Sequence, residues 1–157
     1  MKKQFCGLMG AAITIVTAGI LAPITASATG AEITTGAFKT YATGLSRSYE
    51  ITGNAHMVRV PSGKTIVDIQ VFGLAPNTTY GVHVHNKACS DSNGGGHYMH
   101  DPAGPVDPVN EIWPGFTTNA AGGGNGFATN NFIARPEAQS IVVHDTDKAR
   151  IACADLQ

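Results

Sequence analysis

The sequence predicts an all-β fold, and three observations carry that prediction. Short runs of β-branched and aromatic residues recur along the chain, with Gly, Pro, Asn and Asp between them. No stripe of apolar residues at helical spacing is sustained after residue 30. About eight short strands separated by turn sequences are typical of a β-sandwich or a Greek-key β-barrel.

Each expected strand is an apolar or β-branched run bounded by turn residues. The runs lie at 33–42, 50–60, 64–73, 78–86, 112–118, 126–134, 140–145 and 149–154. Turn chemistry separates most of them, at 61–63, 75–77, 120–126 and 135–139. The segment 87–111 is a long loop of Gly, Pro, Ser, Asn and Asp, and a loop of this length in a compact domain is usually functional or disordered.

The first 28 residues have the features of a secretory signal peptide. Lys2 and Lys3 precede an apolar run, and the Ala-Ser-Ala motif at 26–28 is a cleavage site of the A-x-A type. A membrane anchor fits less well, because no stop-transfer charges follow the apolar run. We therefore expect a single domain at 29–157 that is secreted or periplasmic, with no membrane span after cleavage.

Charge and cysteine content narrow the possible partners. Without Lys2 and Lys3, eight basic residues face eleven acidic ones, so the mature net charge is about −3. No basic run is present, which argues against nucleic acid or an anionic membrane as a partner, and nothing indicates an obligate dimer. The two cysteines that survive cleavage, Cys89 and Cys153, predict one disulfide in an oxidising compartment, the alternative being two buried thiols.

Four of the six histidines are placed so that they can meet at one metal ion. His83 and His85 are two residues apart in a strand, so both imidazoles project from the same face. His97 follows three glycines that let the loop turn back, and His144 ends a later strand. Four neutral imidazoles suit copper or zinc rather than calcium or magnesium. A lone histidine such as His56 is interpreted as a surface residue.

These motifs resemble the copper/zinc superoxide dismutase family. The matching segments occur in order: GVHVH at 81–85, Cys89, GGHY at 95–98, SIVVHD at 140–145 and RIAC at 150–153. The resemblance covers roughly residues 45–157 and implies an eight-stranded Greek-key β-barrel with copper on its outer face. It further implies the following set of roles: His83, His85, His97 and His144 as copper ligands, Cys89 and Cys153 as the disulfide, His97 as proton carrier and Arg150 as guide for the anionic substrate.

Two departures from the family pattern point to its copper-only branch. The interval 98–116 holds one further histidine, His100, so the zinc subsite is incomplete and zinc is expected to be absent or partial. Only five residues separate His144 from Arg150, which implies a shallow, open site. In the copper-only branch a glutamate hydrogen-bonds the third copper ligand, and Glu111 is the candidate here, against the alternative of a solvated loop residue.

Three functions remain open at this point. The first is an exported copper-only superoxide dismutase that converts superoxide to dioxygen and hydrogen peroxide. The second is a dismutase-like protein with little or no turnover that binds or buffers copper; it would need neither Arg150 nor the carboxylate. The third is a structural module stabilised by zinc at His97, His100 and Asp101, which leaves His83, His85 and His144 without a role.

Overall fold

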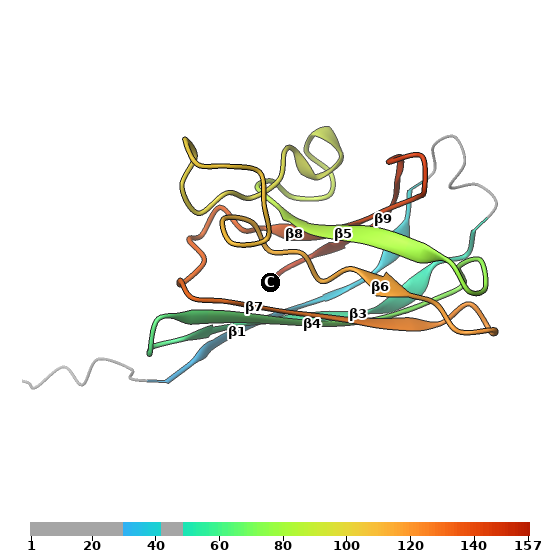
Figure 1. Ribbon diagram of the computed structural model, residues 1–157, viewed down its shortest axis with the longest axis horizontal. Coiled ribbons are helices and arrows are strands. Elements are labelled where there is room, and N and C mark those ends of the chain that lie inside the picture. Colours follow the sequence, from blue (N-terminus) through green and yellow to red (C-terminus); the bar gives the residue numbers. More distant parts are fainter. Residues whose placement is uncertain (1–29, 42–48) are drawn as a thin grey trace, which may run out of the picture.

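The computed structural model describes residues 30–41 and 49–157, and the predicted signal peptide at 1–28 lies outside this part of the chain. The described chain is all-β, as predicted, and its strands form two antiparallel sheets that lie over one another in two layers (Figure 1). This architecture is compatible with a β-sandwich. No helix within the described ranges is both long and apolar enough to cross a membrane.

The two sheets contain four and five strands. The first sheet has the order β1 (Glu32–Ala37), β3 (Thr52–Val60), β4 (Lys64–Phe72) and β7 (Gly124–Asn130). The second has the order β2 (Lys39–Thr40), β9 (Arg150–Asp155), β8 (Ser140–His144), β5 (Thr79–His85) and β6 (Phe116–Thr117). A single turn of 3-10 helix, η2 (Ser92–Gly94), lies in the loop after β5.

Two of the expected strands differ from their predicted form. The run 33–42 is divided at Phe38, whose N–H donates to the carbonyl of Gly53, so that β1 joins one sheet and β2 the other. The run 112–118 shrinks to β6, since Pro114 lies in it and has no N–H to donate to a neighbouring strand. Strand pairing in the described chain therefore leaves two open sheets, and a closed eight-stranded barrel is not formed.

The core lies between the two sheets, and strand alternation decides which side chains enter it. In β5, Tyr80, Val82 and Val84 are buried in the core, whereas His83 and His85 project from the opposite face. The largest side chains with almost no exposure to solvent include Tyr80, Tyr98, Met57, Ile69, Ile112, Ile141 and Ile151. The same strands therefore supply the core on one face and the histidines on the other.

The long loop after β5 returns along the edge of that strand. Two separate parts of the loop bond to Val84: its N–H donates to the carbonyl of Ile112 at 3.0 Å, and its carbonyl accepts from the N–H of Tyr98 at 2.8 Å. The N–H of Asn86 donates to the carbonyl of Gly96 at 2.9 Å. The segment predicted as a long loop is thus ordered against the edge of the second sheet.

Neighbouring residues of β4 test this division between core and surface. Ile69 is 1% exposed, and Ile69→Ala should lower the free energy of unfolding by about 2–5 kcal/mol, because it removes buried methyl groups and leaves a cavity. Gln70 points to solvent, so Gln70→Ala should change it by less than about 0.5 kcal/mol. Chemical denaturation followed by circular dichroism measures both, and equal losses would contradict the assigned faces.

Candidate metal centre

Two adjacent strands place three histidines on the outer face of the second sheet. His83 and His85 come from β5, and His144 ends β8, which pairs with β5 in an antiparallel register that sets Gly81 opposite His144. Paired residues of neighbouring strands project to the same side of a sheet. His144 is therefore on the same face as His83 and His85, although almost sixty residues separate it from them in the chain.

The loop after β5 brings the fourth histidine. An isolated β-bridge pairs His97 with His85, so the chain returns antiparallel to the end of β5. The return passes through Gly94 and Gly95, whose φ angles of 91° and 70° lie in a region that L side chains rarely adopt. A Cβ atom on Gly95 would also lie only 2.4 Å from Oδ1 of Asn86. Two of the three glycines expected to turn the loop, Gly94 and Gly95, are therefore required by the backbone geometry.

The four imidazoles converge closely. Of the described residues, only His83, His85, His97 and His144 form a group that could hold a metal ion, and their potential ligand atoms all lie within 4.8 Å of one another. The Nε2 atoms of His85 and His144 are 3.2 Å apart, and the rings of His83 and His97 stack with centroids 4.0 Å apart.

In three of these histidines, a hydrogen-bond acceptor at one ring nitrogen determines that the other nitrogen is free to bind a metal. Nδ1 of His85 lies 3.3 Å from the carbonyl of Gly95, and Nδ1 of His144 lies 3.2 Å from the carbonyl of Lys148. Nδ1 of His97 lies 2.7 Å from the Glu111 carboxylate. Since these oxygens only accept, each Nδ1 carries the proton and each Nε2 keeps a lone pair.

His83 completes the set with its other nitrogen. Its Nδ1 is buried without a hydrogen-bond partner, and a buried polar atom in that state is costly. A metal ion among the four rings would satisfy this atom, and would also satisfy the two facing Nε2 atoms of His85 and His144. The donor set fits a metal that prefers imidazole, which includes both copper and zinc.

The buried histidines are neutral, as metal ligands must be. Burial, reinforced by the charges of His97 and His144, lowers the pKa of His83 from 6.5 to about 3. The pKa of His85 falls to about 3 for the same reasons, with a further contribution from Arg150. Burial also lowers the pKa of His144. Protons therefore compete weakly with a metal at these nitrogens near neutral pH.

Glu111 is a buried residue and not the solvated loop residue of the alternative interpretation. Its side chain is 1% exposed, and its Oε2 accepts from Nδ1 of His97 at 2.7 Å and from Nε1 of Trp113 at 2.6 Å. Its backbone carbonyl accepts from the side chain of Asn130 at 2.9 Å. Trp113, whose ring also meets that of His83 edge-on at 5.4 Å, was not predicted as a site residue, and its position two residues after Glu111 gave no signal.

A β-bulge places Arg150 beside the histidines. Val143 pairs with Ala152, but His144 pairs with Arg150, so Ile151 is an extra residue in β9. Without this bulge Arg150 would point to the core side of the sheet; with it, Arg150 shares the outer face with His144. Its Nη1 donates to the carbonyls of Ser92 and Asn93 at 3.0 and 2.9 Å, which ties the guanidinium to η2.

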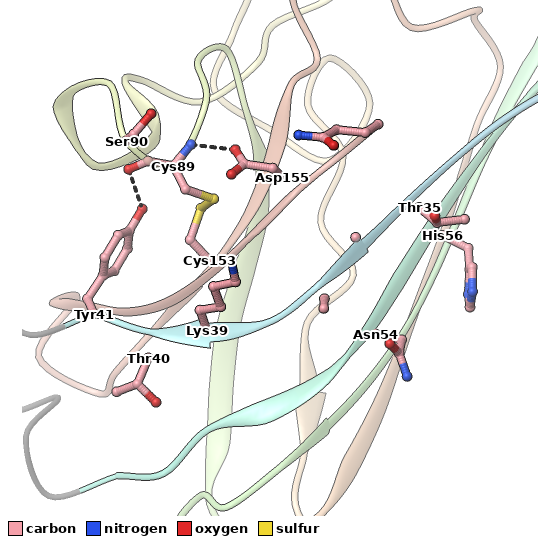
Figure 2. Close-up of a pocket in the computed structure, with 13 residues that line it drawn as sticks. Thr35, Lys39, Thr40, Tyr41, Asn54, His56, Cys89, Ser90, Cys153 and Asp155 are labelled. Atoms are coloured by element: carbon pink, nitrogen blue, oxygen red, sulfur yellow. Dashed lines mark hydrogen bonds between the residues drawn. A yellow bond between two sulfur atoms is a disulfide. The ribbon is translucent and has the colours of Figure 1, made fainter.

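The predicted disulfide is present and links the long loop covalently to β9. Cys89 and Cys153 are bonded, with Cα atoms 5.9 Å apart and a sequence separation of 64. Figure 2 shows the bond beside Asp155, which accepts from the Cys89 N–H at 2.6 Å, and Tyr41, which donates to the Cys89 carbonyl at 3.5 Å. Closing a loop of this length stabilises the fold by about 4 kcal/mol in the chain-entropy model. The bond borders a cavity of about 760 Å³ that none of the four histidines lines.

The remaining candidates lie apart from the cluster. His100 stacks on Phe132 with ring centroids 4.2 Å apart, and the Asp101 carboxylate accepts from the N–H of Ala103 in a turn. Neither residue belongs to the metal-capable group, so the set His97, His100 and Asp101 is not assembled. His56 is half exposed on β3, 3.8 Å from Asp68, as expected for a surface residue.

Comparison with known proteins adds no assignment: no family model matches the chain, and no curated protein matches it. The function is therefore inferred from the geometry and chemistry of the site.

Metal binding should be visible in the fluorescence of Trp113, the chain's single tryptophan, with Cu(II) as the probe. Its ring centroid lies 5.4 Å from that of His83, so Cu(II) held by the histidines should quench it at one ion per chain. His85→Gln should weaken this binding by about 100-fold or more, since loss of an outer-shell partner alone costs 10–100-fold. His100→Gln is the matched control, and equal weakening by both variants would contradict the assigned site.

Acid should destabilise the metal-free protein through the same histidines. The pKa of His85 is about 3 in the folded state and near 6.5 when unfolded, so the unfolded chain binds more protons in between. Stability is then full above pH 6.5 and falls as the pH drops towards 3. His85→Gln should flatten the slope of unfolding free energy between pH 6.5 and about 5, above the range where carboxylates titrate. His56→Gln is the control and should leave the slope as it is in the unmodified protein. If His85→Gln also left the slope unchanged, His85 would not be neutral and buried as described.

Proposed function

We propose that this protein is an exported, copper-dependent superoxide dismutase that works without zinc. The observation that carries the proposal is the arrangement on one face of the second sheet: four imidazoles whose ligand atoms lie within 4.8 Å, with Arg150 paired directly opposite His144. A metal that exchanges single electrons, beside a fixed positive charge that attracts anions, suits electron transfer to and from a small anionic substrate.

The surroundings of His97 favour a single metal. In the copper/zinc enzymes that the motifs resemble, the second ring nitrogen of this histidine would serve zinc. Here Nδ1 of His97 faces the Glu111 carboxylate at 2.7 Å, and that carboxylate is buried. The one further histidine of the interval, His100, packs on Phe132 instead. Glu111 thus takes the position that zinc would hold, and it keeps the proton on Nδ1 as zinc keeps that nitrogen occupied.

The reaction is the disproportionation of superoxide, in which two superoxide ions and two protons give one dioxygen and one hydrogen peroxide. Copper, when bound, supplies the one-electron exchange by alternating between its two oxidation states. The Arg150 guanidinium attracts and orients each anion. Nε2 of His97, which keeps a lone pair, would take up and return a proton in this reaction, while Glu111 holds Nδ1 and so fixes the ring's direction.

The fold and the setting of the chain support the same reading. The four-stranded and five-stranded sheets, with the site on the outer face of the latter, fit the Greek-key arrangement implied by the dismutase motifs. The disulfide fits an oxidising, extracytoplasmic compartment, in agreement with the signal sequence at 1–28. The five residues between His144 and Arg150 form a short hydrogen-bonded turn in place of a long loop.

The main alternative is a protein that stores copper on the same scaffold. Such a protein needs the imidazoles but has no need of a cation aimed at the metal, nor of a proton-holding carboxylate. Arg150 is nevertheless brought to the face by a bulge and held by two carbonyls, and Glu111 is fully buried beside His97. These two features favour turnover over storage.

Dismutation by the copper-loaded protein tests the proposal. Turnover should be fast with copper alone and unchanged by added zinc. Arg150→Ala should lower kcat/KM by about 10-fold or more, because steering by a local charge raises association rates by 10–10³-fold, and the loss should diminish at high salt. His144→Ala should abolish activity, since it removes a ligand.

The control variant is His56→Ala, which alters a histidine on the other sheet and should leave turnover intact. Pulse radiolysis measures the rates directly. Stoichiometric copper binding with no turnover above that of the buffer would overturn the enzyme and leave a copper-binding protein.

A further inference from the structure

Trp113 interacts with the histidine group in two ways, indirectly through Glu111 and directly with His83. The proposed chemistry uses neither interaction. Its Nε1–H donates to Oε2 of Glu111 at 2.6 Å, the same oxygen that accepts from Nδ1 of His97. Its ring lies edge-on to the ring of His83, with centroids 5.4 Å apart and an interplanar angle of 76°. We infer that Trp113 is a positioning residue that acts on His97 through Glu111 and so sets how tightly that histidine holds the metal. This inference rests on the proposed copper site.

The carboxylate needs both donors to stay where it is. Glu111 is 1% exposed, so water cannot take over a lost hydrogen bond, and a buried carboxylate is costly unless donors surround it. The indole and the imidazole meet Oε2 at 2.6 and 2.7 Å, distances typical of strong, charge-assisted hydrogen bonds. With the indole donor removed, only His97 would hold that oxygen, and its position would no longer be defined from two sides.

The two donors also compete for the same electron density. A hydrogen bond from Trp113 draws charge from Oε2 and weakens the pull of that oxygen on the His97 proton. Without the indole donor the oxygen becomes a stronger acceptor, and the proton of Nδ1 is drawn further from the ring. Because the basicity of a ligating imidazole depends on the hydrogen bond at its other nitrogen, the change reaches Nε2.

Because Trp113 also packs against the ring of His83, its packing can be tested separately from its hydrogen bond to Glu111. Nδ1 of His83 has no hydrogen-bond partner, so its ring is oriented by its neighbours, among them Trp113 and the stacked ring of His97. Phenylalanine at position 113 retains an aromatic edge near His83 but has no N–H. Trp113→Phe therefore removes the contact with Glu111 and largely spares the packing.

Nuclear magnetic resonance of the metal-free protein, labelled with ¹⁵N at histidine, tests the hydrogen-bond chain directly. In Trp113→Phe the Nδ1–H proton of His97 should move downfield, because Glu111 becomes the stronger acceptor. The Nδ1–H protons of His85 and His144 are internal controls, since backbone carbonyls hold them, and they should not move. An unmoved His97 proton would overturn the inference.

Fluorinated tryptophan gives the opposite sign without altering the shape of the site. Because the chain has one tryptophan, replacement with 5-fluorotryptophan labels position 113 alone. A more acidic N–H donates more strongly to Glu111, so the His97 proton should move upfield. This measurement needs no substitution, so it decides the question even where Trp113→Phe folds poorly.

A double-mutant cycle on copper affinity tests whether the effect passes through Glu111. Trp113→Phe should raise the dissociation constant for Cu(II) by about 10-fold, within the range for loss of an outer-shell partner, because the loss of a fixed position for Glu111 and His97 outweighs the gain in basicity at Nε2. In a Glu111→Leu background the same substitution should have no further effect. Equal weakening in both backgrounds would show that Trp113 acts by packing alone and would overturn the inference. Neither readout depends on turnover, so a protein that binds copper without dismuting superoxide would leave the inference standing.

Discussion

The candidate metal centre depends on one constraint: each imidazole must present a particular nitrogen to a common point. Three acceptors impose it on three of the rings: the carbonyl of Gly95 and the carboxylate of Glu111, both from the loop after β5, and the carbonyl of Lys148 from the turn after β8. Each acceptor takes the proton of one Nδ1 and leaves Nε2 free. Much of the loop structure described above serves to hold these acceptors in place.

The folding of the domain and the assembly of the centre are coupled through the second sheet. The residues that alternate with His83 and His85 in β5 are core residues, and in β8 the core residues Ile141 and Val143 alternate with the positions on the face of His144. The Cys89–Cys153 bond then fixes the start of the returning loop to β9, close to the carbonyls that hold Arg150. The centre is thus built on strands that the core already orders, which limits the reorganisation needed when a metal binds.

Sequence patterns predicted the parts of the molecule that depend on local periodicity. The two-residue spacing of His83 and His85 placed them on one face, and the two cysteines that remain outside the predicted signal peptide predicted the disulfide. The proximity of the four histidines followed from motifs, because strand pairing between β5 and β8 is a long-range property. Glu111 was left undecided between a loop residue and a partner of His97, since burial of a loop side chain depends on tertiary packing.

Other features could not be predicted because they arise from register. The division of the first strand run at Phe38 depends on a backbone bond to Gly53, and the role of Trp113 depends on a shared carboxylate oxygen. The prediction of Arg150 came from a motif alone; alternation along β9 would have assigned it to the core side. Period-two reasoning fails at a bulge, because the extra residue reverses the order of the two faces beyond it.

That reversal makes the hairpin of β8 and β9 a single unit in which the register of pairing matters as much as the identity of the residues. If Ile151 instead of Arg150 paired with His144, the pairing would be regular and the guanidinium would point inward, while all four histidines and both cysteines remained in the chain. Such a protein would keep its complete set of motifs and lose the cation on its outer face. Transplanting the sequence of this hairpin into another antiparallel scaffold therefore requires that the bulge at Ile151 form there, in addition to the histidines and the arginine.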